Sequence, residues 1–399
     1  MAGARLGAAT RLARSACMRL VLIGDGESPH LLKWARALSQ QREVELWAAS
    51  TRGFAPEFQF LIPEDRRLAM NTDPAHAGGN IAVLRQLPAL GAWLKRVDAD
   101  WLHAHYLTSH GTLAWAARRG WKLRARIAGS AWGSDILVTP DQGWAYRWLT
   151  TKVLQACAIT TSDSEHMSAR MRELGAAEVM TFPFGLEQLP KQNVRKQPWL
   201  FFTNRGLEPI YRPHRVMEVF AAIAAKQPEA RLVVGNDGSL RGALEAQVAS
   251  LGLTDRVEFI GRVDATSQGR RYAPARWFLS LPQSDSVSVS VLEAMAHECL
   301  PILSDLPAND EVLGTGGIAS IDAAMHPNAK LLGRHGLILK DGDDLATLAD
   351  RLQLMVGQSD VAGHSVDADR LGAANRAWVA EHAMFGPAVK TFVERLKRF

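Results

Sequence analysis

The sequence predicts an α/β protein with two doubly wound, Rossmann-like domains that face a central cleft. Two series of short apolar runs alternate with segments whose hydrophobic residues recur at helical spacing, and a polar stretch separates the two series. Parallel strands that are buried on both faces give such continuous apolar runs, and helices then cover the sheet. At 399 residues the chain is too long for one ordinary core and fits two domains of common size.

The first series predicts an amino-terminal domain over residues 18–186. Its first strand, Leu20–Ile23, ends in a Gly-Asp-Gly turn. A helix is expected next, because Leu31, Trp34, Ala35 and Leu38 recur at helical spacing after a proline that suits a first helical turn. The later strands of this domain are expected at Val44–Ala48, Trp101–Ala104, Arg126–Ala128 and Ala158–Thr161.

The second series predicts a carboxyl-terminal domain over residues 199–373. It follows a linker over residues 187–198, which is polar, contains two prolines and has no periodicity. The strands of this domain are expected at Leu200–Phe202, Arg231–Val234, Val257–Ile260, Trp277–Ser280 and Leu300–Leu303. Residues 374–399 are helical in pattern, and we expect this helix to pack back on the amino-terminal domain.

Residues 1–17 differ from the rest of the chain. They contain three arginines, no acidic residue and many alanines, and they lack the apolar centre of a secretory signal. We expect a disordered leader or an upstream start codon, with a targeting segment as the alternative.

The three cysteines share no CxxC spacing, which argues against a disulfide framework or a zinc site and suits a reducing cytoplasm. No apolar run is long enough to cross a bilayer. The segment 118–126 places five cations and a tryptophan within nine residues. It is either a solvated helix end or a contact with anionic lipid head groups. We therefore expect a cytoplasmic protein, peripheral on the inner face of the membrane under the second interpretation, and no nucleic-acid partner.

The run from Asp285 to Glu293 is the strongest candidate for a functional site. A strand, a loop through Asp285 and a helix from about Ser288 fit its valines and serines better than one continuous helix. The free N–H groups near Ser288 and Val289 would then suit a phosphate. The alternative is a capped core helix whose two acidic residues are only solvated.

The stretch from Asp285 to Pro301, with Leu292-Glu293-Ala294-Met295-Ala296 at its centre, resembles the signature of retaining glycosyltransferases of family four. Those enzymes have the two-domain GT-B fold and a Glu-x7-Glu motif. The resemblance implies that Glu293 holds the ribose of the donor nucleotide and that Asp285 contacts the transferred sugar. Asp285 is one methylene shorter than the usual Glu, which leaves the identity of the sugar open.

Two further segments of the second half resemble the family. The run from Thr203 to Arg212 is similar to the segment whose cations grip the donor pyrophosphate, which implies that role for Arg205 and Arg212. The alternative for either arginine, and more for Arg212 than for Arg205, is a surface pair with Glu208. The segment around Val263 is similar to the one whose backbone faces the nucleotide base, although Val263 could equally be a core residue.

In the first half, His105 matches a strand-end histidine that hydrogen-bonds the transferred sugar in the family. A lone histidine at a strand end is otherwise structural. Asp135 lies in a segment that resembles the acceptor side, and we expect it either to contact a substrate or to cap the next helix. Gly26 belongs to a loop that lies beside the donor phosphates in the family. That loop is not a dinucleotide fingerprint, because it lacks the third glycine.

The resemblance implies transfer of a sugar, with retention at the anomeric carbon, from a nucleoside diphosphate sugar of the UDP or GDP type. The acceptor would be a hydroxyl of a glycan or lipid-linked molecule in surface polysaccharide or lipopolysaccharide synthesis. We expect neither a cofactor nor a metal ion. The alternatives are a sugar-nucleotide epimerase or hydrolase of the same fold, and a non-catalytic nucleotide-sugar-binding partner of a polysaccharide assembly complex.

Overall fold

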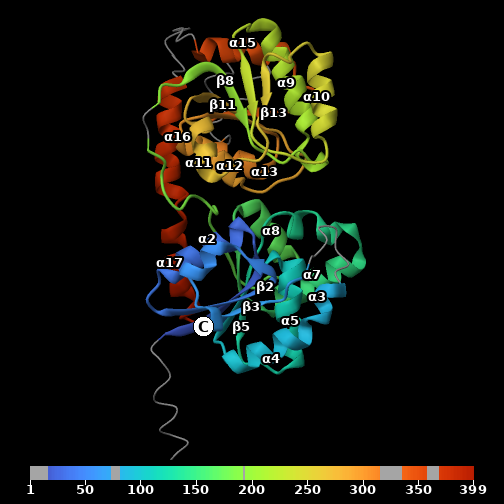
Figure 1. Cartoon of the computed structure of the whole chain (residues 1–399), viewed down its shortest axis with the longest axis vertical. Coiled ribbons are helices and arrows are strands. Elements are labelled where there is room, and N and C mark those ends of the chain that lie inside the picture. Colours follow the sequence, from blue (N-terminus) through green and yellow to red (C-terminus); the bar gives the residue numbers. More distant parts are fainter. Residues whose placement is uncertain (1–16, 73–80, 192–193, 315–334, 357–367) are drawn as a thin grey trace, which may run out of the picture. The chain divides into compact units, whose positions relative to one another are not determined.

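The computed structural model describes residues 17–72, 81–191, 194–314, 335–356 and 368–399. The chain divides into two compact units (Figure 1). Unit 1 comprises Met1–Asp163, Met167–Phe182 and Phe385–Phe399, and unit 2 comprises Ser164–His166 and Pro183–Met384. Residues 1–16 of the predicted leader lie outside the described residues.

Unit 1 contains a parallel seven-stranded sheet in the order β3-β2-β1-β4-β5-β6-β7. The chain adds strands in one direction from β1 and in the opposite direction from β4, so a topological switch point lies between these two neighbouring strands. Open parallel sheets bind ligands at such a point, beyond the carboxyl ends of the strands. The strands are β1 (Met18–Gly26), β2 (Val44–Phe54), β3 (Arg67–Ala69), β4 (Trp101–His105), β5 (Arg126–Ser130), β6 (Cys157–Ser162) and β7 (Val179–Thr181).

Helices cover both faces of this sheet (Figure 1). On one face lie α2 (Pro29–Ser39) and α17 (Phe385–Leu396), and on the other lie α4 (Leu87–Val97), α5 (Thr112–Gly120) and α7 (Trp144–Ala156). The remaining elements are η1 (Pro56–Phe60), η2 (Glu64–Arg66), α3 (Ile81–Arg85), the π-helical turn η3 (Tyr106–Gly111), α6 (Ser134–Leu137), η4 (Thr139–Gln142) and α8 (Glu165–Glu173).

Trp34 organises the α2 face of unit 1. Its side chain is fully buried. Its ring meets Phe385 and Phe392 of α17 edge-on, with ring centroids 5.1 and 5.3 Å apart. Edge-to-face aromatic pairs add about 0.5–1.5 kcal/mol beyond the burial of their area. This contact holds the last helix of the chain in unit 1.

Unit 2 contains a parallel six-stranded sheet in the order β10-β9-β8-β11-β12-β13. Its switch point lies between β8 and β11. The strands are β8 (Gln197–Thr203), β9 (Arg231–Val234), β10 (Val257–Phe259), β11 (Ala275–Ser280), β12 (Leu300–Ser304) and β13 (Leu337–Leu339).

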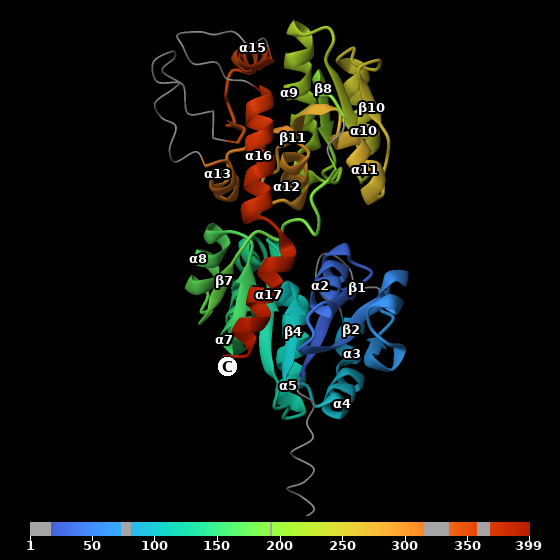
Figure 2. The same ribbon diagram turned by 90° about the vertical axis from the view of Figure 1, so that its left-hand side faces the viewer.

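The helices of unit 2 form two layers. Buried residues of α9 (Pro213–Lys226), α10 (Arg241–Ser250) and α15 (Leu345–Val356) share one core cluster. The other cluster contains residues of α11 (Ala265–Tyr272), α12 (Val289–Ala296), α13 (Pro307–Leu313) and α16 (Ala368–His382). Helix α16 runs beside α12 (Figure 2). A short 3-10 helix, η5 (Pro209–Tyr211), precedes α9.

The predicted fold class, two doubly wound α/β domains, is confirmed. The predicted strands all form, although β8 begins at Gln197, inside the stretch predicted as linker. The final stretch forms two helices with a break after His382 instead of one. Among the helices of the described residues, none is long and apolar enough to cross a membrane.

Candidate functional site

The run from Asp285 to Glu293 has the predicted local structure. β11 ends at Ser280, a loop carries Asp285, and α12 starts at Val289 with Ser288 as its N-cap residue. The first bonds of this helix come from the N–H groups of Val291 and Leu292 to the Ser288 carbonyl. The N–H groups of the preceding turn therefore lie at the positive end of the helix, which favours an anion.

Arg205 joins two of the predicted residues to one another. Its Nη2 lies 2.6 Å from Asp285 Oδ2, and its Nη1 donates to Ser288 Oγ. The guanidinium also lies 4.5 Å from the ring centroid of Tyr211, within range of a cation–π interaction. Arg205 follows β8 and Asp285 follows β11, so the cluster sits at the switch point of the sheet.

The Asp285 carboxylate is partly desolvated. Burial raises its pKa above the ordinary value, while the Arg205 charge and the Ser286 N–H act in the opposite direction. The side chains of Arg205 and Asp285 keep 14% and 23% of their surface exposed, so solvent weakens their attraction. A ligand phosphate could therefore compete with Asp285 for this guanidinium.

Glu293 lies on α12 and accepts a hydrogen bond from a tyrosine that sequence reasoning missed. The Tyr272 hydroxyl is 3.2 Å from Glu293 Oε2 and 3.1 Å from the Ser290 carbonyl oxygen, so these two acceptors share its single proton, and Asn204 Nδ2 donates to that hydroxyl at 2.8 Å. The Tyr272 ring is buried and stacks on His297 with centroids 5.4 Å apart. Asn204 precedes Arg205 in the sequence, and this position could have identified it as a candidate site residue. No sequence pattern distinguishes Tyr272 as a site residue.

Arg212 pairs with a different residue from Glu208, the partner considered in the sequence analysis. Its guanidinium forms a two-pronged pair with Asp341, at 2.5 and 2.9 Å. The Arg212 hydrogen bond lowers the pKa of Asp341. Glu208 instead accepts from the N–H and hydroxyl of Ser239, so the alternative interpretation, a pair of Arg212 with Glu208, is wrong, and the contact of Arg212 with a pyrophosphate stays a prediction. Arg212 also adopts φ 46°, uncommon for a residue with a side chain.

Val263 follows β10 in the loop before α11, and its side chain is half-buried. Gly261, two residues earlier, has φ +70°, a backbone conformation that glycine adopts without strain. These facts fit a loop with accessible backbone, and the contact of Val263 with a nucleotide base stays a prediction.

In unit 1, His105 ends β4 and is only 2% exposed. Trp132 Nε1 donates to His105 Nδ1 at 3.2 Å, so the neutral ring carries its proton on Nε2. Within the described residues, Nε2 is buried without a hydrogen-bond partner. Burial, together with the neighbouring histidines His103, His110 and His30, holds the pKa of His105 well below its usual value. The ring is therefore a neutral donor.

Asp135 holds the loops around this histidine. Its Oδ1 accepts from the N–H of Trp132 at 2.9 Å, and its Oδ2 accepts from the N–H of Leu107 at 2.8 Å. Burial raises its pKa to about 6 against these two bonds. The N-cap of α6 is Gly133, so the expectation that Asp135 caps the next helix is wrong. Its contact with an acceptor stays a prediction.

Gly26 is required by the neighbouring strand. A Cβ at this position would lie 2.5 Å from the Gly53 carbonyl oxygen and 2.6 Å from a ring carbon of Phe54. Its N–H donates to Ser50 Oγ at 2.8 Å. Packing against the neighbouring strand thus explains why position 26 is a glycine. The close approach of donor phosphates to Gly26 stays a prediction.

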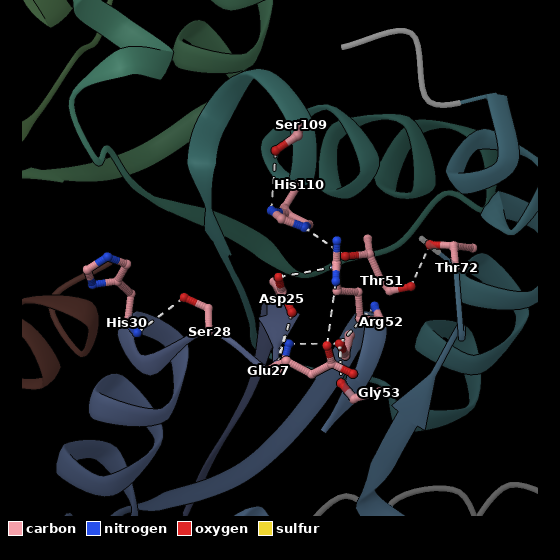
Figure 3. Close-up of polar contacts among 12 residues, drawn as sticks. Asp25, Glu27, Ser28, His30, Thr51, Arg52, Gly53, Thr72, Ser109 and His110 are labelled. Atoms are coloured by element: carbon pink, nitrogen blue, oxygen red, sulfur yellow. Dashed lines mark hydrogen bonds and ion pairs between the residues drawn. The ribbon is translucent and has the colours of Figure 1, made fainter. Parts of the chain in front are cut away.

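A polar cluster that sequence reasoning missed lies at the ends of β1 and β2 (Figure 3). Arg52 is 3.6 Å from both Asp25, near the end of β1, and Glu27, the first residue after β1. Thr51 pairs with His110 Nε2 at 3.1 Å. Two carboxylates and one guanidinium can bind hydroxyl groups of a polar ligand. Asp25 belongs to the Gly-Asp-Gly segment expected as a turn after Leu20–Ile23, but its ion pair with Arg52 depends on the pairing of β1 with β2.

A groove of about 740 Å³ lies elsewhere in unit 2. Its lining includes the first residues of β8, β9 and β10 and side chains of α11. Arg205, Asp285 and Glu293 are not among the lining residues. The residues predicted for the donor lie instead after the carboxyl ends of strands, where ligands bind in open parallel sheets.

Two family models match consecutive parts of the chain. The family described as "Glycosyl transferases group 1" matches residues 186–352, and the "Glycosyl transferase 4-like domain" matches residues 25–185. The first match contains Arg205, Asp285 and Glu293, and the second contains His105 and Asp135. No curated protein matches the sequence.

Several solved structures share the fold. Sucrose-phosphate synthase from Thermosynechococcus elongatus is 15% identical, with a TM-score of 0.71 over 96% of this chain and 98% of that one. Anabaena HepE in complex with UDP-glucose is 12% identical, with a TM-score of 0.67 over 96% and 100%. S. aureus TarM, solved with UDP, is 12% identical, with a TM-score of 0.61 over 78% of this chain. This chain spans 58% of that TarM chain.

Proposed function

Because the chain is a GT-B glycosyltransferase with a group 1 domain, we propose that it moves a hexose-type sugar from a nucleoside diphosphate sugar to a hydroxyl group. We further propose that the anomeric configuration is retained, that UDP or GDP is the leaving group, and that no metal ion is needed. The acceptor is a glycan or lipid-linked molecule of bacterial-type surface polysaccharide synthesis. HepE bound to UDP-glucose and a lipopolysaccharide galactosyltransferase, WaaB, are among the proteins of similar fold.

The observation that carries this proposal is the joint position of Arg205, Asp285 and Ser288 at the start of α12. A diphosphate placed there would meet a guanidinium and the positive end of a helix, and both stabilise negative charge. Glu293 lies about one turn further along the same helix, where its carboxylate can accept hydrogen bonds from ribose hydroxyls. Arg212 is assigned a second phosphate contact, for which it must leave Asp341.

The chemical step needs charge stabilisation more than an acid or a base. Arg205 and the N–H groups at Val289 neutralise the departing diphosphate as the glycosidic bond breaks. Asp285 steadies the positive charge that develops on the sugar. His105 is assigned a hydrogen bond from Nε2 to the transferred sugar, because its neutral ring is a donor and its other nitrogen is engaged. The leaving phosphate then accepts the proton of the acceptor hydroxyl in a same-face substitution.

We place the protein in the cytoplasm, in peripheral contact with the inner membrane face. The segment 118–126 supports this assignment, because Arg119, Lys122, Arg124 and Arg126 are exposed. Exposed cations at a surface are attracted to anionic lipids by about 1 kcal/mol each. A lipid-linked acceptor would be presented at that membrane face.

A thermal-shift panel of UDP, GDP, ADP and their sugars tests the donor assignment. A nucleotide at 100 times its dissociation constant adds about 2.7 kcal/mol of stability. We expect one diphosphate and its sugars to stabilise the wild type, and Glu293→Gln to lose most of that shift. A protein that none of these ligands stabilises, or that NAD stabilises instead, would contradict the proposal.

A further inference from the structure

We propose that unit 1 docks on an anionic membrane surface through the first two turns of α7, with Trp144 and Trp148 entering the head-group region. Trp144 is 83% exposed and Trp148 is 52% exposed, and Tyr146 between them is 41% exposed. Tryptophan is normally well buried, and neighbouring exposed rings mark an interaction site more often than ordinary surface. We call Trp144 and Trp148 the aromatic face of α7; Tyr146, two residues from each, projects from the other side of the helix.

The aromatic face is rigidly presented. Thr150, Val153 and Leu154 on the opposite side of α7 are buried, and the last two belong to the core of unit 1. Trp144 and Trp148 are four residues apart, so their side chains project from the same side of the helix. No folding of a mobile segment is needed for the rings to be available.

The position of the aromatic face follows from the topology. Helix α7 is the connection that leads from β5 to its parallel neighbour β6. Such a crossover begins beyond the carboxyl end of the first strand and ends near the amino end of the second. Trp144 therefore lies at the same end of the sheet as His105, which ends β4. A membrane on the aromatic face would lie at the end of unit 1 that carries this candidate site.

The charges around the aromatic face match an anionic surface. Helix α7 has no acidic residue, and it carries Arg147 and Lys152 on its exposed surface. From Trp101 to Ser162 the only acidic residues are Asp135 and Asp141. Asp135 is buried, and Asp141 is paired with Arg170 at 2.5 Å and with Arg147 at 3.6 Å. The surface of this segment is therefore strongly cationic.

Helix α5, which packs against α7 on the same face of the sheet (Figure 1), leads from the carboxyl end of β4 to the amino end of β5. The basic segment 118–126 therefore lies at the other end of the sheet from Trp144, and the cations beside Trp144 and Trp148 are Arg147 and Lys152 of α7 itself. Tryptophan and tyrosine prefer the head-group depth of a bilayer because each ring has an apolar body and a polar edge. Aromatic rings interleaved with cations on one helix face are typical of helices that lie on anionic membranes. Anionic lipid is therefore the occupant that fits this surface.

Membrane docking would bring the protein to a lipid-linked acceptor. The inference rests on the proposed function only in this respect, because the docking surface itself is argued from the residues of α7. The test is cosedimentation of the full chain with vesicles of phosphatidylglycerol and phosphatidylethanolamine, against vesicles of phosphatidylcholine. We expect binding to the anionic vesicles that weakens with salt, and a loss of partitioning on the order of tenfold in Trp144→Ala/Trp148→Ala. The matched control is Phe60→Ala, which removes another exposed ring, 82% exposed, from η1.

Equal binding of the double variant and the wild type would overturn the inference. So would an absence of binding to anionic vesicles, or a double variant whose main change is its oligomeric state in sedimentation velocity. The replaced rings are exposed, so thermal unfolding of the variants should match the wild type. Nucleotide binding is measured without vesicles and so separates the two proposals. The double variant should bind the same nucleotide as the wild type. If the wild type itself bound none of the nucleotides, that result would count only against the donor assignment.

Discussion

The guanidinium of Arg205 lies 2.6 Å from the carboxylate of Asp285 at the start of α12. The same guanidinium is the group assigned to the donor diphosphate, and the same carboxylate is assigned to the transferred sugar. Without a ligand the two groups therefore satisfy one another. Donor binding is expected to draw Arg205 toward phosphate and to leave Asp285 facing the sugar.

Replacing Asp285 with Asn separates these two roles. We expect the rate of transfer to fall about 100-fold, because one group that stabilises the transition state is lost. Affinity for the free nucleoside diphosphate should stay the same or rise, because Arg205 no longer has a competing carboxylate. Titration calorimetry and initial rates measure the two effects. Asp350→Asn, which removes a surface pair with Lys226, is the control. A parallel loss of nucleotide affinity would disprove the exchange.

Tyr272→Phe tests whether the tyrosine hydroxyl positions Glu293. The ring and its packing on His297 remain, while the hydrogen bond to Glu293 Oε2 is removed. We expect KM for the donor to rise roughly five- to tenfold, about 1–1.4 kcal/mol, with a smaller change in kcat. A drop in kcat at constant KM would contradict a positioning role. Asn204→Asp should show a related effect, since its amide donates to the same hydroxyl.

Gly26→Ala tests why this glycine is needed. The added Cβ would meet the backbone oxygen of Gly53, so we expect a loss of about 1–3 kcal/mol in the free energy of unfolding. Gly120→Ala, where the added carbon meets nothing within 4 Å, is the matched control and should be tolerated. Denaturant unfolding measures both. Unchanged stability with weakened donor binding would instead favour the phosphate contact.

Four histidines of unit 1, of which His103, His105 and His110 are buried and His30 is half-buried, make its stability depend on pH. Burial lowers the pKa of His30 to about 4 and of His103 to about 3, and it also lowers the pKa values of His105 and His110. Below pH about 6.5 the unfolded chain binds protons that the folded one does not, so stability is present above this pH and lost as pH falls. Each such histidine contributes up to about 1.4 kcal/mol per pH unit.

Asp135 acts in the opposite direction, because its raised pKa, about 6, lets the folded protein take up a proton first. The histidines outnumber it, so urea unfolding at pH 7.5, 6.5 and 5.5 should show decreasing stability. His103→Gln should make this decrease less steep, whatever its effect at pH 7.5. A stability that rises on acidification would show that these rings are protonated in the fold.

Much of the fold followed from the sequence because its central strands are continuous apolar runs. The start of α12 also followed, since serine is a good N-cap residue at position 288, and Ser286 and Val287 before it disfavour a longer helix. The edge strands β3, β7 and β13 have three residues each and give no pattern of their own. The break between α16 and α17 has a local cause, because Pro387 is tolerated in the first turn of α17 but would disrupt the interior of one continuous helix.

The candidate site was only partly predictable. Arg205 and Asp285 were marked by their motif, and their contact follows from the adjacency of β8 and β11. The partners Tyr272, Asp341 and Arg52 could not be found in the same way, because each meets its site through tertiary packing. Asp135 shows the same limit, since one of its two backbone bonds comes from Leu107 in η3, 28 residues earlier in the chain.

The most direct test of the central claim is the product balance of the purified protein with a nucleoside diphosphate sugar and a hydroxyl acceptor. Release of nucleoside diphosphate and formation of glycoside should proceed in equal amounts, should require the acceptor, and should be lost in Glu293→Gln. Release of free sugar, isomerisation of the donor, or nucleotide binding without any turnover would contradict the assignment of this chain as a glycosyl-transferring enzyme.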